Sequence, residues 1–397
     1  MSSEKVVKAS QEKYDKYFID TYSYKPVVID KGEGATIYDT EGNSYIDFAG
    51  GIGVASLGYN NPTLVKALQN QVAKITHVSN IFFSEKVLEV GEKLIKASKY
   101  SKVFFSNSGT ESNELAMKIA RKYSSDKYGK NRGTIVSLNH SFHGRTMMSV
   151  MACGQDKYHK YYYPLPEGFK YTKANDIEDF KKVIEDNSIC AVILEAIQGE
   201  GGVYVLDGDY LKEVEKICNE KDILLICDEV QCGMGRSGKL FAFNHSNIKP
   251  DIVTIAKGIG AGLPVGAVLV NEKTKDVMQK GEHGTTFGGN VLGMTAASVL
   301  IDELEKPGFY DEVTAKGKYI IGYIKKLNSE KVLDVRGKGL MIGIEIDGDP
   351  SEIINKLIEN GLLVLTAGPH VVRLLPPLVM EKEDIEKGID ILIKVLQ

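Results

Sequence analysis

Lys257 is the residue of this sequence with the clearest potential for chemistry. It closes the apolar run of "DIVTIAKGIGAGLPVGA" (251–267), directly before a glycine-rich turn. A buried ammonium is costly unless it is paired or neutralised, so this lysine is either a solvated strand end or a group kept for its chemistry. Asp228 and Glu229 end the preceding apolar run, "ILLICDEV" (223–230), and alternation along a strand points them to opposite faces. One of these acids and Lys257 would meet at the carboxyl edge of a parallel sheet, where ligands bind.

A third candidate is the stretch "SNSGTESNELAMKIAR" (106–121). Ser108 is placed to cap a helix and Glu111 to complete a capping box. Gly109 leaves backbone N–H groups open to a ligand, and Thr110 adds a hydroxyl donor. Such a helix start is a natural phosphate seat, although an ordinary capped helix explains the stretch equally well when it is taken alone. The P-loop and Rossmann glycine patterns are both incomplete, so neither type of nucleotide site is indicated.

Taken together, the lysine, the acid and the phosphate seat fit the chemistry of pyridoxal 5'-phosphate. A lysine holds the aldehyde of this cofactor as a Schiff base, and a carboxylate pairs with the pyridinium nitrogen, so that the ring can accept electrons from a carbanion. Lysine suits the role because burial readily lowers its pKa. We therefore expect Lys257 and Asp228 to be the catalytic residues and pyridoxal phosphate to be the cofactor.

The elements that must position these residues follow from the alternation of short β-branched runs with amphipathic helical stretches. This pattern predicts an α/β fold with a mostly parallel sheet covered on both faces. Beyond about residue 305 helical and strand patterns mix around glycine turns, which indicates a smaller α+β domain. The N-terminal segment 26–48 would join this domain as a hairpin with its turn at 41–43. The strand candidates are residues 102–107, 133–139, 190–196, 223–230, 251–256 and 264–271. The expected division is an N-terminal segment (1–60), a large cofactor-binding domain (61–305) and a C-terminal small domain (306–397).

Composition excludes several classes of protein. The 397 residues carry a formal net charge of −4, which argues against nucleic-acid binding through a basic face and against a polybasic membrane anchor. There is no apolar run long enough for a transmembrane helix and no apolar signal-peptide core, so we expect a cytoplasmic protein. The five cysteines form no C-x-x-C pair and are expected to be free thiols. No cluster of histidine, cysteine and carboxylate predicts a metal site.

Seven motifs together resemble class-III aminotransferases, which are pyridoxal-phosphate enzymes of fold type I. In chain order they are "NSGTESNELAMKIAR", "SFHGRT", "EAIQGEGGV", "ICDEVQCGMGRSG", "IAKGIGAGLPVGA", "GTTFGGN" and "VVRLLPPL". The similarity extends from about Pro26 to Leu378. It implies a seven-stranded, mostly parallel sheet in the large domain and a homodimer with shared active sites.

The resemblance also implies roles for individual residues. Lys257 would form the Schiff base and Asp228 would pair with the pyridine nitrogen. Phe142 would stack on the ring, and Thr286 would reach the phosphate of the other subunit. The cofactor-binding residues expected on this basis are Ser108, Gly109, Thr110, Phe142, Asp228, Glu229, Val230, Gln231, Lys257 and Thr286.

Four residues are expected to contact substrate. Arg145 and Arg373 are candidate forks for carboxylates, because guanidinium pairs with carboxylate in bidentate fashion. By the resemblance, Glu200 would mask Arg373 for one substrate and release it for the other, and Thr285 would be a secondary contact. The reaction implied is a ping-pong transfer of the δ-amino group of N2-acetyl-L-ornithine to 2-oxoglutarate.

Alternatives remain on the same scaffold. The amino donor could be ornithine, succinylornithine, succinyl-diaminopimelate or 4-aminobutyrate. Departures from the family pattern at Ala196, Val291, Thr285 and Phe287 leave the fine substrate preference open. An aminomutase, which is an isomerase, would not need a switch between Glu200 and Arg373. A non-catalytic binding protein would not need to retain the lysine and the acid.

Overall fold

The structure is a computed structural model that describes residues 3–327 and 329–397. Its centre is a seven-stranded sheet in the order β4-β12-β11-β10-β7-β5-β6. All neighbouring strands are parallel except β12, which is antiparallel to both β11 and β4. The strands are β4 (Lys102–Ser106), β5 (Thr134–Leu138), β6 (Phe169–Thr172), β7 (Ile189–Leu194), β10 (Leu224–Asp228), β11 (Ile252–Ile255) and β12 (Gly266–Val270).

The sheet confirms the mostly parallel α/β prediction and all six strand candidates. The seventh strand, β6, is the short edge strand Phe169–Thr172, in which only Thr172 is fully buried and Lys170 is exposed. It therefore lacks the continuous apolar run by which the central strands are recognised.

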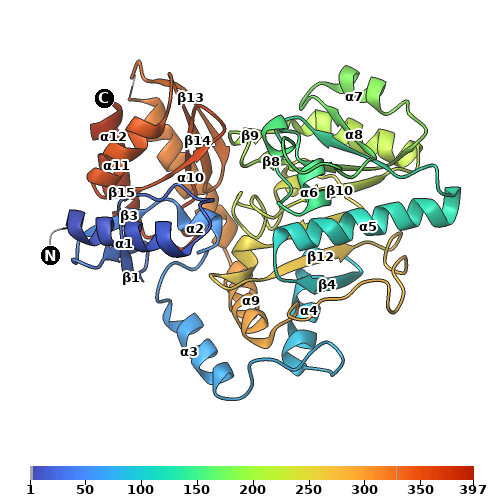
Figure 1. Ribbon diagram of the computed structural model, residues 1–397, viewed down its shortest axis with the longest axis horizontal. Helices are drawn as coiled ribbons and strands as arrows, with labels where there is room; N and C mark the ends of the chain where they lie inside the picture. Colours follow the sequence, from blue (N-terminus) through green and yellow to red (C-terminus); the bar gives the residue numbers. More distant parts are fainter. Residues whose placement is uncertain (1–2, 328) are drawn as a thin grey trace.

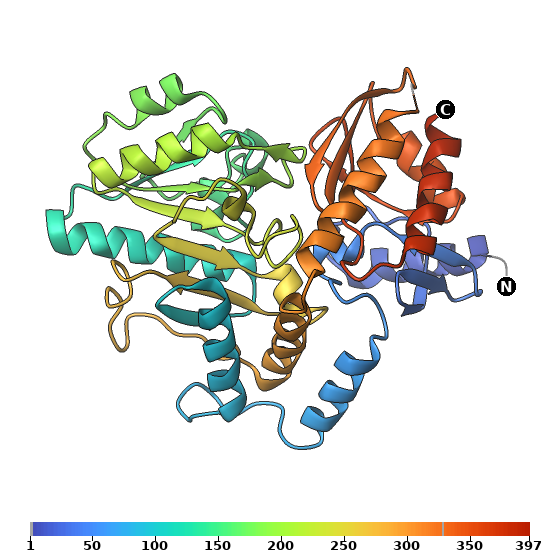
Figure 2. The ribbon, with the colours of Figure 1, turned by 180° about the vertical axis from the view of Figure 1, so that it is seen from behind.

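Helices cover the sheet on both faces. In Figure 1 α5 (Gly109–Tyr128) crosses the front of the sheet, and in Figure 2 α8 (Gly208–Glu220) lies on the opposite face. Alternation along β10 explains the two cores: Leu224 and Ile226 pack in the cluster of α5, whereas Leu225 and Cys227 pack in the cluster of α8. The remaining helices of this region are α3 (Pro62–Val72), α4 (Glu85–Ser98), α6 (Met147–Ala152), α7 (Ile177–Val183) and α9 (Val291–Leu304).

The two ends of the chain lie together beside this sheet (Figure 1). A four-stranded sheet joins β1 (Ile29–Glu33), β2 (Thr36–Asp39) and β3 (Ser44–Asp47) to β15 (Leu362–Leu363). The predicted turn at 41–43 connects β2 to β3, and β1 adds a third N-terminal strand. A second four-stranded sheet contains β13 (Val332–Lys338), β14 (Met341–Ile346), β17 (Val371–Leu374) and β16 (Leu365–Ala367). The helices of the two ends are α1 (Ser3–Tyr17), α2 (Gly50–Gly53), α10 (Phe309–Lys325), α11 (Ser351–Glu359) and α12 (Lys382–Leu396).

The domain boundaries at residues 60 and 305 stay a proposal. All five cysteines are buried and free, as expected. Among residues 3–327 and 329–397, no helix is both long and apolar enough to cross a membrane.

Candidate active site

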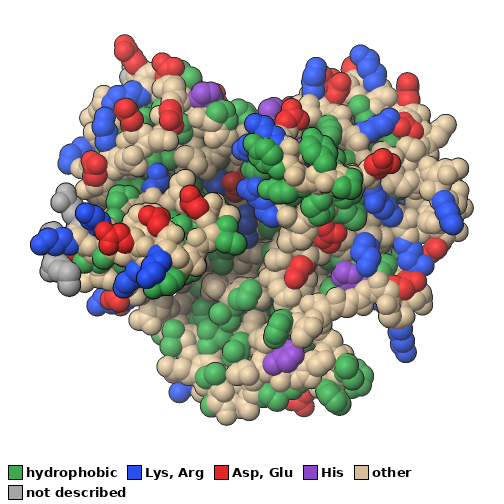
Figure 3. Space-filling view, in the orientation of Figure 1, with side chains coloured by type: hydrophobic (Ala, Val, Ile, Leu, Met, Phe, Trp, Pro, Cys, Tyr) green, Lys and Arg blue, Asp and Glu red, His purple; other side chains and the backbone are tan. Residues whose placement is uncertain are grey.

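Most of the predicted site residues surround one cavity of about 680 Å³ at the carboxyl ends of the sheet strands. Figure 3 shows the molecule hollowed between its two parts, with acidic and basic side chains inside the hollow. Loops that follow β4, β10 and β11 supply much of the lining, as expected for an open α/β sheet. The predicted residues that line the cavity are Ser108, Gly109, Thr110, Phe142, Arg145, Glu200, Asp228, Val230, Gln231 and Lys257.

The start of α5 forms one wall of the cavity. Ser108 is the N-cap, and its hydroxyl accepts a hydrogen bond from the Glu111 N–H at 3.3 Å. The reciprocal half of the predicted capping box is different, because the Glu111 carboxylate accepts from the N–H of Asn107 (2.6 Å). A Cβ on Gly109 would lie 2.6 Å from Val230 Cγ1, so only glycine lets the helix start approach Val230 this closely. The positive end of the α5 dipole therefore faces the cavity and favours an anion there.

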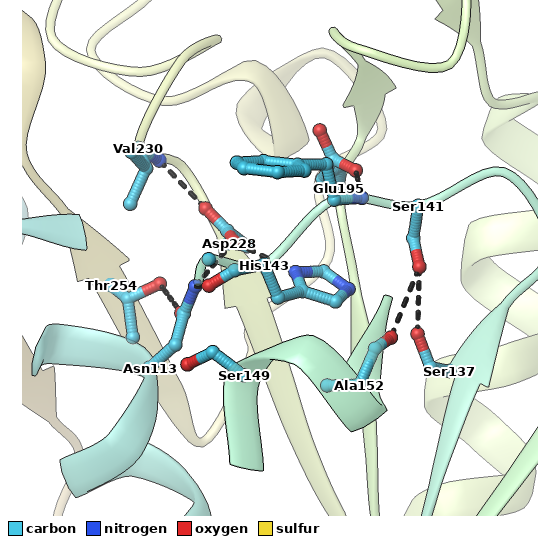
Figure 4. Close-up of polar contacts among 12 residues, drawn as sticks. Asn113, Ser137, Ser141, His143, Ser149, Ala152, Glu195, Asp228, Val230 and Thr254 are labelled. Carbon is cyan, nitrogen blue, oxygen red and sulfur yellow. Dashed lines mark hydrogen bonds and ion pairs between the residues drawn. The ribbon is translucent and has the colours of Figure 1, made fainter. Parts of the chain in front are cut away.

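Asp228 ends β10 and is fixed by three neighbours (Figure 4). Its Oδ2 accepts from Asn113 Nδ2 (2.7 Å) and lies 2.8 Å from His143 Nδ1, while its Oδ1 accepts from the Val230 N–H (2.9 Å). Thr254 donates to Asn113 Oδ1 at 2.7 Å and so sets which end of the amide faces Asp228. Asp228 is 3% exposed, which makes this a preorganised acid at the base of the cavity.

Lys257 follows β11 and begins the short helix η3 (Lys257–Gly260). Its φ of +47° is unusual for a residue with a side chain, and the residue lines the cavity. Burial lowers the pKa of the Lys257 ammonium below its ordinary value, although the carboxylates of Glu200 and Asp228 act in the opposite direction. A lowered pKa increases the neutral fraction of the amine, which is the nucleophilic form.

Arg373 lies on β17 behind the cavity wall and is 3% exposed. Its Nη1 donates to Glu200 Oε1 (2.7 Å) and to Gln231 Oε1 (2.9 Å), and Gln231 Nε2 donates to the same Glu200 oxygen (3.1 Å). Burial by itself raises the pKa of Glu200, but Arg373 and Lys257 outweigh it and bring this pKa to about 2. The structure thus places the predicted pair in direct contact, with Glu200 ionised and covering the arginine.

Arg145 lies at the exposed rim of the cavity. Its guanidinium carbon is 4.2 Å from the centroid of the Tyr158 ring and 5.3 Å from that of Phe142. Cation–π contacts of this kind favour a restricted orientation of the fork. Arg145 can therefore meet a carboxylate that enters from solvent.

Besides Arg373, three predicted residues do not line this cavity. The buried carboxylate of Glu229 accepts from the N–H groups of Ala242 (2.7 Å) and Phe243 (3.0 Å) on the other face of the sheet, away from the cavity. Thr285 accepts from Asn107 Nδ2 (3.2 Å) outside the cavity, and Thr286 is exposed on the surface. Strand alternation explains why Asp228 and its neighbour Glu229 lie on opposite faces.

Four residues were missed by the sequence reasoning. Glu195 lines the cavity just beyond β7, and burial raises its pKa to about 7. Its position after a buried strand was the same signal that pointed to Asp228. Asn113 and His143 hold Asp228 but carry no local pattern that links them to it. Tyr22 reaches the cavity from the N-terminal segment, and nothing in the sequence around it indicates this.

Comparison with known proteins places this fold and site in a family. The model of the aminotransferase class-III family matches residues 19–396. The chain belongs to the class-III aminotransferases. It is similar to the acetylornithine aminotransferase of Caldanaerobacter subterraneus subsp. tengcongensis, with 46% identity over 384 residues that cover 96% of this chain and 97% of the relative.

Solved structures of aminotransferases are also similar to this chain. An ornithine aminotransferase from Toxoplasma gondii, whose active site is partially occupied by pyridoxal phosphate, superposes with a TM-score of 0.95 at 30% identity, covering 99% of this chain and 94% of that one. The acetylornithine aminotransferase from Elizabethkingia anophelis superposes with a TM-score of 0.88 at 32% identity, covering 98% of both chains.

Proposed function

We propose that this aminotransferase uses pyridoxal 5'-phosphate to transfer the δ-amino group of N2-acetyl-L-ornithine to 2-oxoglutarate, giving N-acetyl-L-glutamate 5-semialdehyde and L-glutamate. The observation that carries the proposal is the meeting of Lys257, Asp228 and the Glu200–Arg373 pair around one cavity. The curated relative from C. subterraneus supports the choice of donor, since it is similar over nearly the whole of both chains. The reaction would belong to arginine biosynthesis in the cytoplasm.

The residues of the cavity fit the proposed cofactor. The glycine at the start of α5 leaves room beside Val230, and the unpaired N–H groups of the helix suit a phosphate. Asp228, held by its donors, suits the pyridine nitrogen, and Lys257 suits the aldehyde. The bound cofactor would supply an electron sink for the carbanion that forms when a proton leaves the substrate carbon.

The residues of the chain would divide the remaining work. Lys257 Nζ would be both the nucleophile and the group that moves the proton, because burial lowers its pKa and so favours the neutral amine that can accept a proton. Asp228 would keep the ring nitrogen protonated without reorganising, since Asn113 and Val230 hold its two oxygens. Arg145 would bind the α-carboxylate of the donor at the cavity rim.

The Glu200–Arg373 pair would let one cavity serve two substrates. The δ-amino donor has no carboxylate next to its reacting amine, so a free Arg373 would face no partner; Glu200 covers it. Glutamate has a carboxylate beside its amine, and this group would displace Glu200 from Arg373. Arg145 would then bind the distal carboxylate of glutamate. An aminomutase has no need of this exchange, which favours the transaminase.

The active enzyme would be a homodimer in which Thr286 of one subunit completes the phosphate site of the other. Thr286 is exposed and lies in a surface hollow with Phe82 and Phe83, two strongly exposed aromatic residues. Exposed apolar groups of this size support an interface at this surface. Thr285, on the same loop, would contact substrate in the same way.

A donor panel tests the assignment. With 2-oxoglutarate as acceptor, kcat/KM is compared for N-acetylornithine, ornithine, succinylornithine, succinyl-diaminopimelate and 4-aminobutyrate. We expect N-acetylornithine to be preferred. A large preference for free ornithine would contradict the proposed donor but leave the class intact, and absence of amino transfer from every donor would contradict the proposal as a whole.

A further inference from the structure

The loop that carries Glu200 is held from outside its own sheet. It connects β8 (Ile197–Gln198) to β9 (Tyr204–Val205) and contains glycine at positions 199, 201 and 202. Arg336, on β13 of the C-terminal sheet, donates to the Gly202 carbonyl from Nε (3.1 Å) and from Nη2 (2.8 Å). The Gly368 N–H, beside the same sheet, donates to the Glu200 carbonyl at 2.9 Å.

Arg336 is itself well restrained. Its Nη1 donates to Asp334 Oδ2 (2.9 Å) and to the Glu345 carboxylate, and its guanidinium carbon is 4.1 Å from the centroid of the Tyr204 ring. The side chain is 14% exposed. All five donors of arginine form a fixed fork, so one side chain can tie a backbone carbonyl of the loop to two carboxylates of the C-terminal sheet.

The loop depends on backbone hydrogen bonds of this kind because its three glycines have no side chains that could pack against the rest of the protein. Gly202 has φ +129°, which a residue with a side chain rarely adopts, and a Cβ on Gly201 would lie 2.5 Å from the His140 carbonyl oxygen. The same C-terminal sheet carries Arg373 on β17. Arg336, which binds Gly202, and Arg373, which binds Glu200, therefore lie on the same sheet. This common sheet fixes the distance between Glu200 and Arg373.

We propose that Arg336 is a specificity-setting positioning residue: by clamping the Gly202 carbonyl it holds Glu200 over Arg373 and so sets how often Arg373 is free to take a second carboxylate. The inference rests on the proposed function of the Glu200–Arg373 pair and extends it to a residue that touches neither substrate nor cofactor. A ligand with two carboxylates must displace Glu200, so its apparent affinity falls with the fraction of enzyme in which Arg373 is free. A ligand with one carboxylate, bound by Arg145, is indifferent to the clamp.

The test compares glutarate, which has two carboxylates, with butyrate, which has one, by calorimetric titration of the enzyme loaded with pyridoxal phosphate. Arg336→Met should bind glutarate roughly fivefold to tenfold more tightly than the wild type, in line with the loss of charge-assisted hydrogen bonds to one carbonyl. Butyrate affinity should stay within about twofold. Single half-reactions should follow the same order, with kcat/KM rising for glutamate and unchanged for N-acetylornithine.

Arg132→Met is the matched control. Arg132 also donates to backbone carbonyls, those of Ile189 (2.9 Å) and Lys221 (2.7 Å), and stacks at 4.2 Å on Tyr128, but it lies at the opposite end of the strands from the cavity. It should lose comparable stability without changing the ratio of glutarate to butyrate affinity. Arg336→Lys, which keeps the charge and loses the fork, should shift the ratio in the same direction by a smaller factor.

A double variant separates positioning from general damage. In Glu200→Ala protein Arg373 is already uncovered, so adding Arg336→Met should leave glutarate affinity unchanged. An unchanged or weakened glutarate affinity in both Arg336 variants, or a full effect of Arg336→Met in the Glu200→Ala background, would overturn the inference. Failure of the wild type to use N-acetylornithine would instead overturn the proposed donor, and the glutarate comparison would still decide the role of Arg336.

Discussion

Replacing Asn113 by leucine should destabilise the cofactor-free protein strongly. Both hydrogens of this amide are used, one for Asp228 Oδ2 (2.7 Å) and one for the His143 carbonyl (2.8 Å), and the side chain is buried. A hydrogen bond to a charged group contributes about 1.5–3 kcal/mol, and a buried carbonyl that loses its donor costs about 1–3 kcal/mol. The two together predict a loss of roughly 3–5 kcal/mol.

Urea unfolding of the cofactor-free protein measures this loss. Thr254→Val should cost about 1 kcal/mol by itself, because it removes only the donor to Asn113 Oδ1. In the Asn113→Leu background the same change should cost nothing further, since Thr254 acts through Asn113. Asn219→Leu, at an exposed site on α8, is the control and should change stability by less than about 0.5 kcal/mol. A cost below about 1 kcal/mol for Asn113→Leu would refute the view that this network fixes Asp228.

Three further outcomes follow from the structure. Gly109→Ala should weaken binding of pyridoxal phosphate by about tenfold, measured by fluorescence titration, because the added methyl meets Val230; Val230→Ala should restore most of the affinity, and no rescue would contradict the steric argument. Arg373→Leu should lower kcat/KM for the glutamate half-reaction by about 100-fold or more and spare the N-acetylornithine half-reaction, whereas an equal loss in both would show that Arg373 serves both substrates. Burial raises the pKa of Asp222, but Lys127 and its other partners outweigh burial and lower this pKa well below its ordinary value. The difference in unfolding free energy between wild type and Asp222→Asn should therefore be fully present above the ordinary aspartate pKa of 3.8 and shrink as pH falls below it; a constant difference from pH 7 to pH 3 would contradict this.

The sequence was most informative where the signal is local. Buried parallel strands are short apolar runs, so Asp228 and Lys257 can be recognised from the sequence alone as strand-end residues. Glu195 stands at the same kind of strand end and could have been found by the same rule. The edge strand β6 lacks a continuous apolar run and gave no such signal.

Other features depend on contacts between distant parts of the chain. Arg336 meets Gly202 across 134 positions, and Asn113 meets Asp228 across 115, and no spacing pattern reports such pairs. The direction of a side chain at a strand end is also set by the fold. Asp228 and Glu229 are adjacent in sequence, yet only the carboxylate of Asp228 faces the cavity. Thr286 is exposed, and a role for it requires a second subunit that one sequence does not describe.

The central claim is that one amine, that of Lys257, carries the cofactor. Purified protein supplied with pyridoxal phosphate should be reduced with borohydride, digested and analysed by mass spectrometry. We expect a phosphopyridoxyl group on the peptide that contains Lys257 and none on that peptide from Lys257→Ala protein. An unlabelled wild-type chain, or a label confined to other lysines, would contradict it.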